Sequence, residues 1–255
     1  MRNVQTLIVL FGTLALTAIA HGTDTRKSGF DFMQPATQAL QKDDAQNPAM
    51  LWVKDGLSLW IKQDGAAAKS CANCHGEITG MRGVATRYPA YSSAQKKVIN
   101  LSQQINVCRV ELQRATPWPP EHESLLGLEA AIAKASRDLP IKPPAHPQLT
   151  QAQKRGEALF NQRIGQIDLS CRDCHDTLAG KKLGGNTIPQ GHATGYPIYR
   201  LEWQSLGSLQ RRLRGCMTAV RAEPYAFGAS ELVELEAFLA RRGAGMNVES
   251  PSVRP

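Results

Sequence analysis

The chain has 255 residues, with 30 lysines and arginines against 22 aspartates and glutamates, and a formal net charge of +8. This length suits one large domain or two small ones, each able to bury a core. The positive charge favours an anionic partner or substrate. Nucleic acid is the common partner of a basic protein, but the basic residues form no long runs and aromatic residues make up only 6% of the chain. We therefore expect no nucleic-acid binding.

Residues 1–20 have the pattern of a secretory signal peptide. Arg2 supplies the positive charge, Leu7 to Ala20 are mostly apolar, and Ala18-Ile19-Ala20 is a typical cleavage site. The apolar run is shorter than the roughly 20 residues needed to cross a bilayer, and no later segment is as apolar. We expect export to the periplasm and no membrane span in the mature protein, which would begin at His21.

Four of the six cysteines lie in two C-x-x-C-H motifs, Cys71-Ala72-Asn73-Cys74-His75 and Cys171-Arg172-Asp173-Cys174-His175. In this motif the two thiols form thioethers to a porphyrin, and the adjacent imidazole binds the iron. A zinc ribbon would place its cysteine pairs roughly 15 to 20 residues apart, much closer than these, and a thioredoxin-like pair needs no histidine. The motifs predict two covalently bound haem c groups, with Cys71 and Cys74 holding haem 1 and Cys171 and Cys174 holding haem 2.

An internal repeat relates the two halves of the chain. Gly56-Leu57-Ser58-Leu59-Trp60 and Gly156-Glu157-Ala158-Leu159-Phe160 stand at the same distance before their motifs. After a glycine-rich insertion in the second half, Tyr88-Pro89-Ala90-Tyr91 matches Tyr196-Pro197-Ile198-Tyr199. Each of these segments is followed, at the same distance, by one of the two remaining cysteines, Cys108 and Cys216.

The apolar spacing around Cys108 (Val98, Leu101, Ile105, Leu112) and around Cys216 (Trp203, Leu206, Leu209, Leu213, Val220) predicts helices that turn both thiols inward. Further helices are expected over 124–137 and 230–242, and Thr150-Gln151-Ala152-Gln153 reads as a capping box that opens a helix. The fold class is therefore mainly α, a tandem of two cytochrome-c-like domains. Their predicted bounds are residues 21–139 and 150–255, joined by a proline-rich linker over 140–149.

The role of Cys108 and Cys216 has two interpretations. Exported cysteines commonly pair, which would give a Cys108–Cys216 disulfide. Their equivalent places in the repeat instead favour a sixth iron ligand in each domain, where a thiolate would stabilise ferric iron. Other candidate ligands are weaker. Met81 is close to its own motif, Met217 points away from Cys216 on the helix, and His192 lies in the insertion.

The surroundings of the two thiols differ in charge. Residues 103–106 read Gln-Gln-Ile-Asn, whereas the matching residues 211–214 read Arg-Arg-Leu-Arg. Arg212 precedes Cys216 by one helical turn, so it shares a side of the helix with the thiol, and a guanidinium suits sulfate-like oxygens. A basic helix face exposed to solvent is the alternative interpretation.

Several segments together resemble a known family. In the second half the resemblance lies in Gly191-His192-Ala193-Thr194-Gly195-Tyr196-Pro197-Ile198-Tyr199-Arg200-Leu201-Glu202-Trp203, in residues 211–214 and in Cys216-Met217. In the first half it lies in Asn106-Val107-Cys108-Arg109. The chain resembles the dihaem A subunit of the SoxAX cytochromes of bacterial sulfur oxidation. The resemblance implies iron ligation by His75 with Cys108 and by His175 with Cys216. It also implies that Cys216 is the catalytic residue, carrying a persulfide, and that Arg212 binds substrate, with Arg214 as a second candidate.

The family activity implied by the resemblance is that of an L-cysteine S-thiosulfotransferase, which oxidatively conjugates thiosulfate to a cysteine of the SoxYZ sulfur carrier. The implied partners are a monohaem SoxX-type cytochrome, SoxYZ and a soluble cytochrome c that accepts electrons. A thiosulfate dehydrogenase that forms tetrathionate and a plain dihaem electron carrier are the alternatives. A dihaem peroxidase fits less well, because it needs an open iron position.

Overall fold

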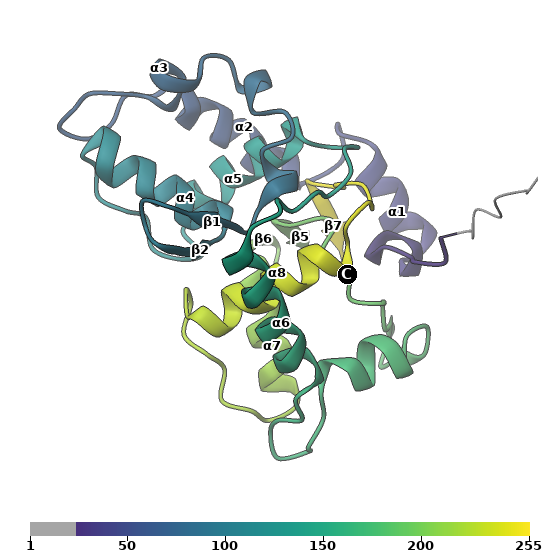
Figure 1. Cartoon of the computed structure of the whole chain (residues 1–255). Coiled ribbons are helices and arrows are strands. Elements are labelled where there is room, and N and C mark those ends of the chain that lie inside the picture. The colour runs from purple at the N-terminus through teal and green to yellow at the C-terminus, as the bar shows by residue number, and fades with distance from the viewer. Residues whose placement is uncertain (1–23) are drawn as a thin grey trace, which may run out of the picture.

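The structure is a computed structural model that describes residues 24–255 (Figure 1). The predicted signal peptide at 1–20 and the cleavage point before His21 lie outside the described residues. Among the helices of residues 24–255, none is long and apolar enough to cross a membrane.

The elements follow one another in the order that the repeat predicts, with short strands added. The α-helices are α1 (Pro35–Lys42), α2 (Ala49–Ile61), α3 (Cys71–His75), α4 (Leu101–Cys108), α5 (Glu123–Ala135), α6 (Pro147–Asn161), α7 (Leu209–Ala219) and α8 (Ser230–Arg242). The strands are β1 (Ala90–Ser92), β2 (Lys97–Ile99), β3 (Lys182–Leu183), β4 (Asn186–Thr187), β5 (Ile198–Arg200), β6 (Ser205–Gly207) and β7 (Ser252–Arg254). Short 3₁₀ turns are η1 (Gly29–Phe32), η2 (Ile78–Met81) and η3 (Ala85–Arg87), and π turns are η4 (Arg109–Gln113) and η5 (Asp173–Thr177).

Each half is built on one close helix pair, α2 with α5 in the first half and α6 with α8 in the second. Gly56 and Gly156, which match in the sequence repeat, lie at the two crossings. A Cβ atom at Gly56 would collide with the carbonyl oxygen of Gly127, and one at Gly156 with that of Glu234. The glycine in each repeat therefore allows the two helix backbones to approach closely.

The hairpins of the two halves are exchanged. The β5–β6 hairpin belongs to the second half, yet Leu206 and Tyr199 pack in the core cluster formed by α2 and α5 of the first half. In the same way Val98 of the β1–β2 hairpin packs against Leu149 on α6 and Ala237 on α8. The two halves are thus interlocked, with the hairpins lying between the helix pairs (Figure 1).

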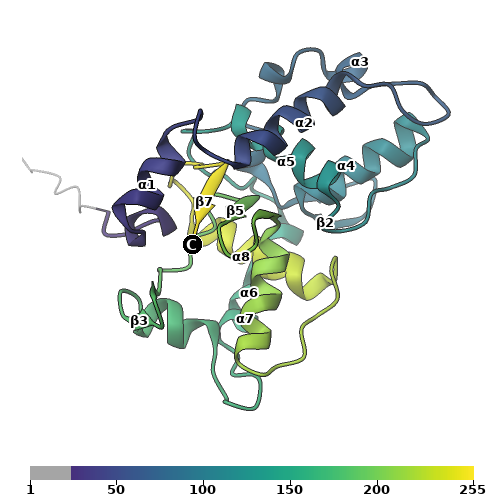
Figure 2. The same cartoon turned by 180° about the vertical axis from the view of Figure 1, so that it is seen from behind.

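The two ends of the described chain meet at a small sheet with strand order β6-β5-β7. β7 runs parallel to β5, with Tyr199 opposite Val253. α1 lies against β7 (Figure 2), where Gln41 accepts a hydrogen bond from the backbone of Val253. Residues 24–47, which the sequence assigns to the first domain, therefore pack against the end of the second.

Two sequence predictions are wrong in detail. The helix predicted to open with a capping box at Thr150 begins at Pro147, and the Thr150 hydroxyl instead donates to the carbonyl of His146. The N-terminal parts of both apolar stripes are also not helical, since Val98 lies in β2 and Leu206 in β6. A short apolar run fits a strand as well as a helix, because its periodicity is too brief to separate the two.

Candidate active site

The two C-x-x-C-H motifs form tight turns that are capped in the same way. Ser70 and Asn73 form a reciprocal capping box at the start of α3, and Ser170 and Asp173 form the same pair of hydrogen bonds in the second half. Such a box satisfies backbone N–H groups at the start of a helical turn. It fixes the direction in which the motif leaves the preceding loop.

In the second half, the motif residues and Cys216 converge. The side chain of His175 faces Cys216, and the charge on the Cys216 sulfur acts on both Cys171 and Cys174. The Nδ1 atom of His175 lies 2.8 Å from the carbonyl oxygen of Pro189. A carbonyl only accepts, so Nδ1 carries a proton and Nε2 keeps its lone pair for a metal.

This donor set fits a covalently bound haem c. Two thiols in motif spacing could form the thioethers to the porphyrin, an imidazole held in one tautomer could bind the iron, and the facing thiol could supply a further ligand. Gly191 completes the support of the imidazole. Its φ is +70°, and a Cβ there would lie 3.0 Å from Cγ of His175.

Cys216 lies on α7 in surroundings that favour its thiolate. Burial by itself would raise the pKa of the thiol, but the facing His175 side chain and the positive charges of Arg212 and Arg200 lower it by more. The net pKa is below the ordinary value. Met217, the next residue on α7, points about 100° away from Cys216 and is buried against Phe160 and Leu232.

The three arginines of α7 have different surroundings. Arg211 stacks on Trp203, with 4.1 Å from its guanidinium carbon to the ring centre. Arg214 donates to the carbonyl of Tyr225 and stacks on Phe227 at 4.5 Å. Arg212 is the one whose charge acts on the Cys216 sulfur. Of the two predicted substrate-binding arginines, the structure brings Arg212 to the thiol and holds Arg214 against a loop.

The first half has the same layout with neutral groups at the thiol. Gln104 stands one turn before Cys108, and its Nε2 donates to Sγ of Cys108 across 3.4 Å. The charge on the Cys108 sulfur acts on Cys71, so this thiol also lies close to its motif. The indole of Trp60 packs beside His75, with ring centres 5.8 Å apart.

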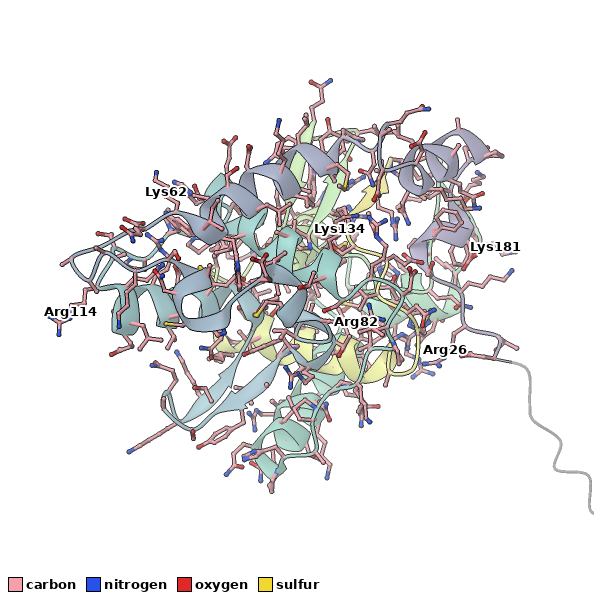
Figure 3. The ribbon with its side chains drawn as sticks, turned by 90° about the horizontal axis from the view of Figure 1, so that it is seen from above. Arg26, Lys62, Arg82, Arg114, Lys134 and Lys181 are labelled. Carbon is pink, nitrogen blue, oxygen red and sulfur yellow. The ribbon has the colours of Figure 1, made fainter. Side chains whose placement is uncertain are left out.

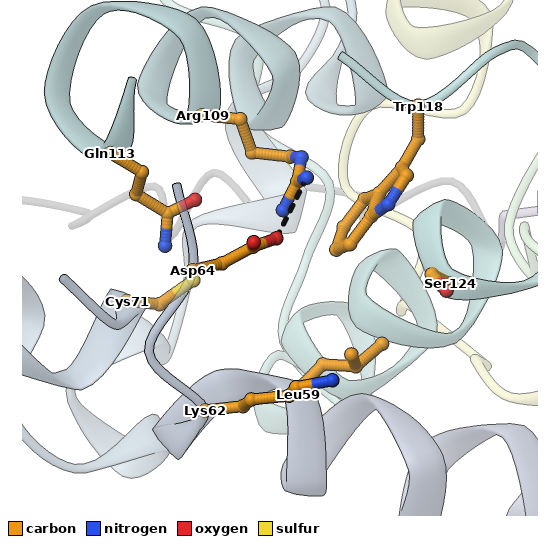
Figure 4. A pocket seen from close by; sticks show the side chains of 8 residues that line it. All are labelled: Leu59, Lys62, Asp64, Cys71, Arg109, Gln113, Trp118 and Ser124. Atoms are coloured by element: carbon orange, nitrogen blue, oxygen red, sulfur yellow. Dashed lines mark hydrogen bonds and ion pairs between the residues drawn. The ribbon is translucent and has the colours of Figure 1, made fainter. Parts of the chain in front are cut away.

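A cavity of about 140 Å³ borders Cys71 (Figure 4). Arg109 fills one side of it, 3.0 Å from the Asp64 carboxylate and 3.4 Å above the ring centre of Trp118. The matching position in the second half is Met217, which is apolar and buried in the core. The two sites therefore differ behind the thiol as well as beside it.

The weaker ligand candidates have other contacts. Met81 packs on the apolar cluster of the first half. His192 lies near Arg242, Arg26 and Asp24, and its pKa is lowered to about 4, chiefly by burial. All six cysteines are among the described residues, and none of them forms a disulfide.

Two residues near Cys216 were not predicted as site residues. Burial raises the pKa of Tyr196, and the charges of Arg212 and Cys216 both act on its hydroxyl. Arg200, whose side chain is 9% exposed, pairs with Glu202 at 2.6 Å and adds positive charge near the thiol. The sequence repeat could have pointed to Tyr196, because Tyr88 precedes Cys108 by the same number of residues as Tyr196 precedes Cys216, and Cys108 acts on the Tyr88 hydroxyl.

The fold and the two C-x-x-C-H sites define a protein built from cytochrome c domains, which carry covalently bound haem c. The family described as SoxA/TsdA, cytochrome c domain, matches residues 55–141 and 155–248. The chain belongs to the SoxA family of L-cysteine S-thiosulfotransferase subunits.

Individual relatives are similar over most of the chain. The L-cysteine S-thiosulfotransferase subunit SoxA of Rhodovulum sulfidophilum is 35% identical, with 92% of this chain and 83% of the relative covered. The protein of the same name from Pseudaminobacter salicylatoxidans is 36% identical, with 95% and 85% covered. Among solved structures, SoxXA from P. pantotrophus matches with a TM-score of 0.87 and 30% identity, covering 90% of this chain and 87% of that one.

Proposed function

We propose that this chain binds two haem c groups and is the catalytic subunit that conjugates thiosulfate to a cysteine of a SoxYZ-type carrier protein. His75 with Cys108 and His175 with Cys216 are the proposed iron ligands. Cys216 is the proposed catalytic nucleophile. The observation that carries this proposal is the asymmetry between two otherwise matched thiols, because Cys216 has Arg212 beside it where Cys108 has Gln104.

The positive charge beside Cys216 suits a doubly charged substrate. Arg212 would bind the sulfonate oxygens of thiosulfate through paired N–H donors and so offset their charge. Arg214 is a less favourable second candidate, because the Tyr225 carbonyl and the Phe227 ring already engage it. Substrate would be held with its outer sulfur towards the Cys216 thiolate.

The proposed reaction balances in two steps. First, the Cys216 thiolate bonds to the outer sulfur of thiosulfate, which gives a Cys216–S–SO₃⁻ adduct and releases two electrons. Then the carrier thiolate, having given up its proton, attacks that outer sulfur and expels Cys216 as a thiolate. The haem supplies one-electron acceptance when bound, so the electrons leave singly towards a soluble cytochrome c. A persulfide on Cys216 would extend the reactive sulfur beyond the ligand position.

We also propose a monohaem SoxX-type partner and a periplasmic location. The partner is supported by the match to a solved SoxXA structure, and the location by the signal-peptide pattern of residues 1–20. The six lysines and arginines that Figure 3 labels come from both halves of the chain and lie at separate places on the molecule.

Whole-protein mass spectrometry tests the proposal. We expect a mass with two haems and, on Cys216, an added sulfur or thiosulfonate that a thiol reductant removes. The Cys216→Ser variant should lose the addition, whereas the matched Cys108→Ser variant should keep it. A Cys108–Cys216 disulfide in the native protein would overturn both ligand assignments.

The product of the reaction separates the alternative functions. Thiosulfate is supplied with and without the carrier protein, and both the carrier adduct and free tetrathionate are measured. Adduct formation that depends on Cys216 supports the proposal, while tetrathionate formed without carrier indicates a thiosulfate dehydrogenase. Electron transfer that is unchanged in Cys216→Ser, with neither product, indicates a plain electron carrier.

A further inference from the structure

Two carboxyl groups, Glu129 and Glu236, lie at the junction between the halves and take no part in the proposed reaction. Leu125, Leu128 and Ile132 on α5 pack in the first-half core as Leu232, Leu235 and Leu239 on α8 pack in the second. The shared spacing of these leucine positions puts Glu129 and Glu236 at the same place on matching helices. The pair is therefore a product of the repeat.

Glu236 is held in the interior by groups from both halves. It is 6% exposed, and its Oε2 accepts a hydrogen bond of 2.9 Å from Nδ2 of Asn100, at the start of α4. The Gln210 side chain on α7 lies beside it. Burial raises the pKa of Glu236 to about 7, although Asn100 and Gln210 act against that rise.

Glu129 is less well satisfied. Its Oε2 is buried without a hydrogen-bond partner, and Ser102 is a polar neighbour of the carboxyl group. Burial raises its pKa to about 8, and the negative charges of Glu236 and Glu121 add to the shift. A buried carboxylate with these neighbours is costly, so the neutral acid is favoured.

A cavity of about 60 Å³ lies between the halves and is lined by Glu129 and by Asn100, which donates to Glu236. Glu129, Gln210 and Ser102 are among its lining residues. Gln210 is 5% exposed, and its Nε2 has no hydrogen-bond partner within residues 24–255. The unpaired Nε2 donor of Gln210 and the unpaired Oε2 acceptor of Glu129 belong to residues that line the same polar cavity. Water bound there could hydrogen-bond to both atoms and carry protons to and from the carboxyl groups.

The charged groups that act on the pair are all acidic. The segment before α5 contributes Glu121, while α4 and α7 contribute the uncharged Asn100, Ser102 and Gln210. On their outer sides, α5 and α8 meet α2 and α6 through glycine and apolar side chains, and the ion pairs Arg155–Glu234 and Arg241–Glu157 join α6 to α8 nearer the surface. No lysine or arginine of the described chain compensates either carboxylate, so a proton is the cation that the pair can take up.

Each glutamate follows directly after a leucine that belongs to the apolar core beside a C-x-x-C-H motif. Leu128 belongs to the cluster that contains Cys71, and Leu235 to the one that contains Cys171. An electron added beside these clusters places negative charge in a low-dielectric interior, where it favours protonation of a nearby acid.

We propose that Glu129 and Glu236 form one shared proton-binding site that takes up a proton when a neighbouring haem is reduced. The electron comes from the reductant, and the proton comes from solvent water and forms an O–H bond on a carboxylate oxygen. Oxidation reverses both changes. The proposal rests on the haem-binding part of the proposed function and is independent of the carrier and of thiosulfate.

Infrared difference spectroscopy of the complete haem protein tests the site directly. At pH 7 to 8, chemical reduction should strengthen the carbonyl band of a protonated carboxylic acid. Glu129→Gln and the double variant Glu129→Gln/Glu236→Gln should lose this change, whereas Glu123→Gln, an exposed carboxyl on the same helix, should keep it. A band that does not change on reduction of the native protein overturns the inference.

Potentiometric titration gives a second readout. The haem potential should fall as pH rises through the range of 7 to 8, with a limit of about 59 mV for each tenfold change in proton concentration. The Glu129→Gln variant should have a flatter dependence than the native protein, and an identical slope overturns the inference. A haem count on the same samples separates this failure from failure of the haem assignment. If haem is missing, the infrared pH titration still tests the raised pKa values.

Discussion

Nε2 of Gln104 lies 3.4 Å from Sγ of Cys108, one helical turn away, and Arg212 holds the same position relative to Cys216. The two halves thus offer a matched pair of thiols with a neutral donor at one and a cation at the other. Together with the difference behind the thiols, where Arg109 of the first half matches Met217 of the second, this charge difference distinguishes the two sites.

Replacing Arg212 with the residue of the first half tests this difference. We expect Arg212→Gln to lower kcat/KM for thiosulfate by about 100-fold, the typical effect of losing one positioned charge at a reacting centre. The haem absorption spectrum should stay unchanged. Gln104→Leu is the matched control and should leave turnover unaltered; an equal loss in both variants would contradict the assignment.

Gly191 should be essential for holding His175. Alanine at φ +70° costs about 1 to 2 kcal/mol in backbone strain, and its Cβ would also press on the imidazole from 3.0 Å. We expect Gly191→Ala to lower the thermal stability and to perturb the absorption spectrum of one haem. Gly180→Ala is the control, because φ there is +84° and the space around a Cβ is open. It should show the backbone cost with no spectral change.

The helix crossing at Gly156 should tolerate no side chain. A Cβ there would collide with the Glu234 carbonyl, so Gly156→Ala must push α6 and α8 apart. We expect a loss of roughly 1 to 3 kcal/mol in the free energy of unfolding, measured by denaturant titration. Gly215→Ala, in open space within α7, should gain up to about 1 kcal/mol through helix propensity. An unchanged free energy of unfolding in Gly156→Ala would show that the two helices are not in close contact at this crossing.

His192 should make the protein less stable in acid. Its pKa is lowered from 6.5 to about 4, first by burial and then by the charges of Arg242 and Arg26. Between these values the unfolded chain binds more protons than the folded one, so the free energy of unfolding rises with pH. The contribution is lost as pH falls from 6.5 towards 4.

Denaturant unfolding at several pH values between 4 and 7 measures this effect. His192→Asn should flatten the acid side of the profile. His122→Asn is the control, because His122 is exposed and caps α5 through a side-chain acceptor that asparagine also supplies. Unchanged profiles in both variants would contradict the role of His192.

The sequence by itself determined the features that depend on local spacing. C-x-x-C-H chemistry needs two thiols and an imidazole within five positions, and the order of the repeat follows from direct comparison of the two halves. The bounds of 230–242 agree with α8, whose apolar positions recur over several turns. The capping box predicted at Thr150 placed the start of α6 too late. The helix begins at Pro147, because the fixed φ of proline suits the first position of a helix.

Only the tertiary structure decided how the halves meet. The exchange of the two hairpins and the separation of Arg212 from Arg214 depend on contacts between segments far apart in the chain. In the sequence, Glu129 and Glu236 are ordinary helical carboxylates. Their burial follows from the packing of two whole helix pairs, and a linear pattern of residues carries no record of which faces will meet.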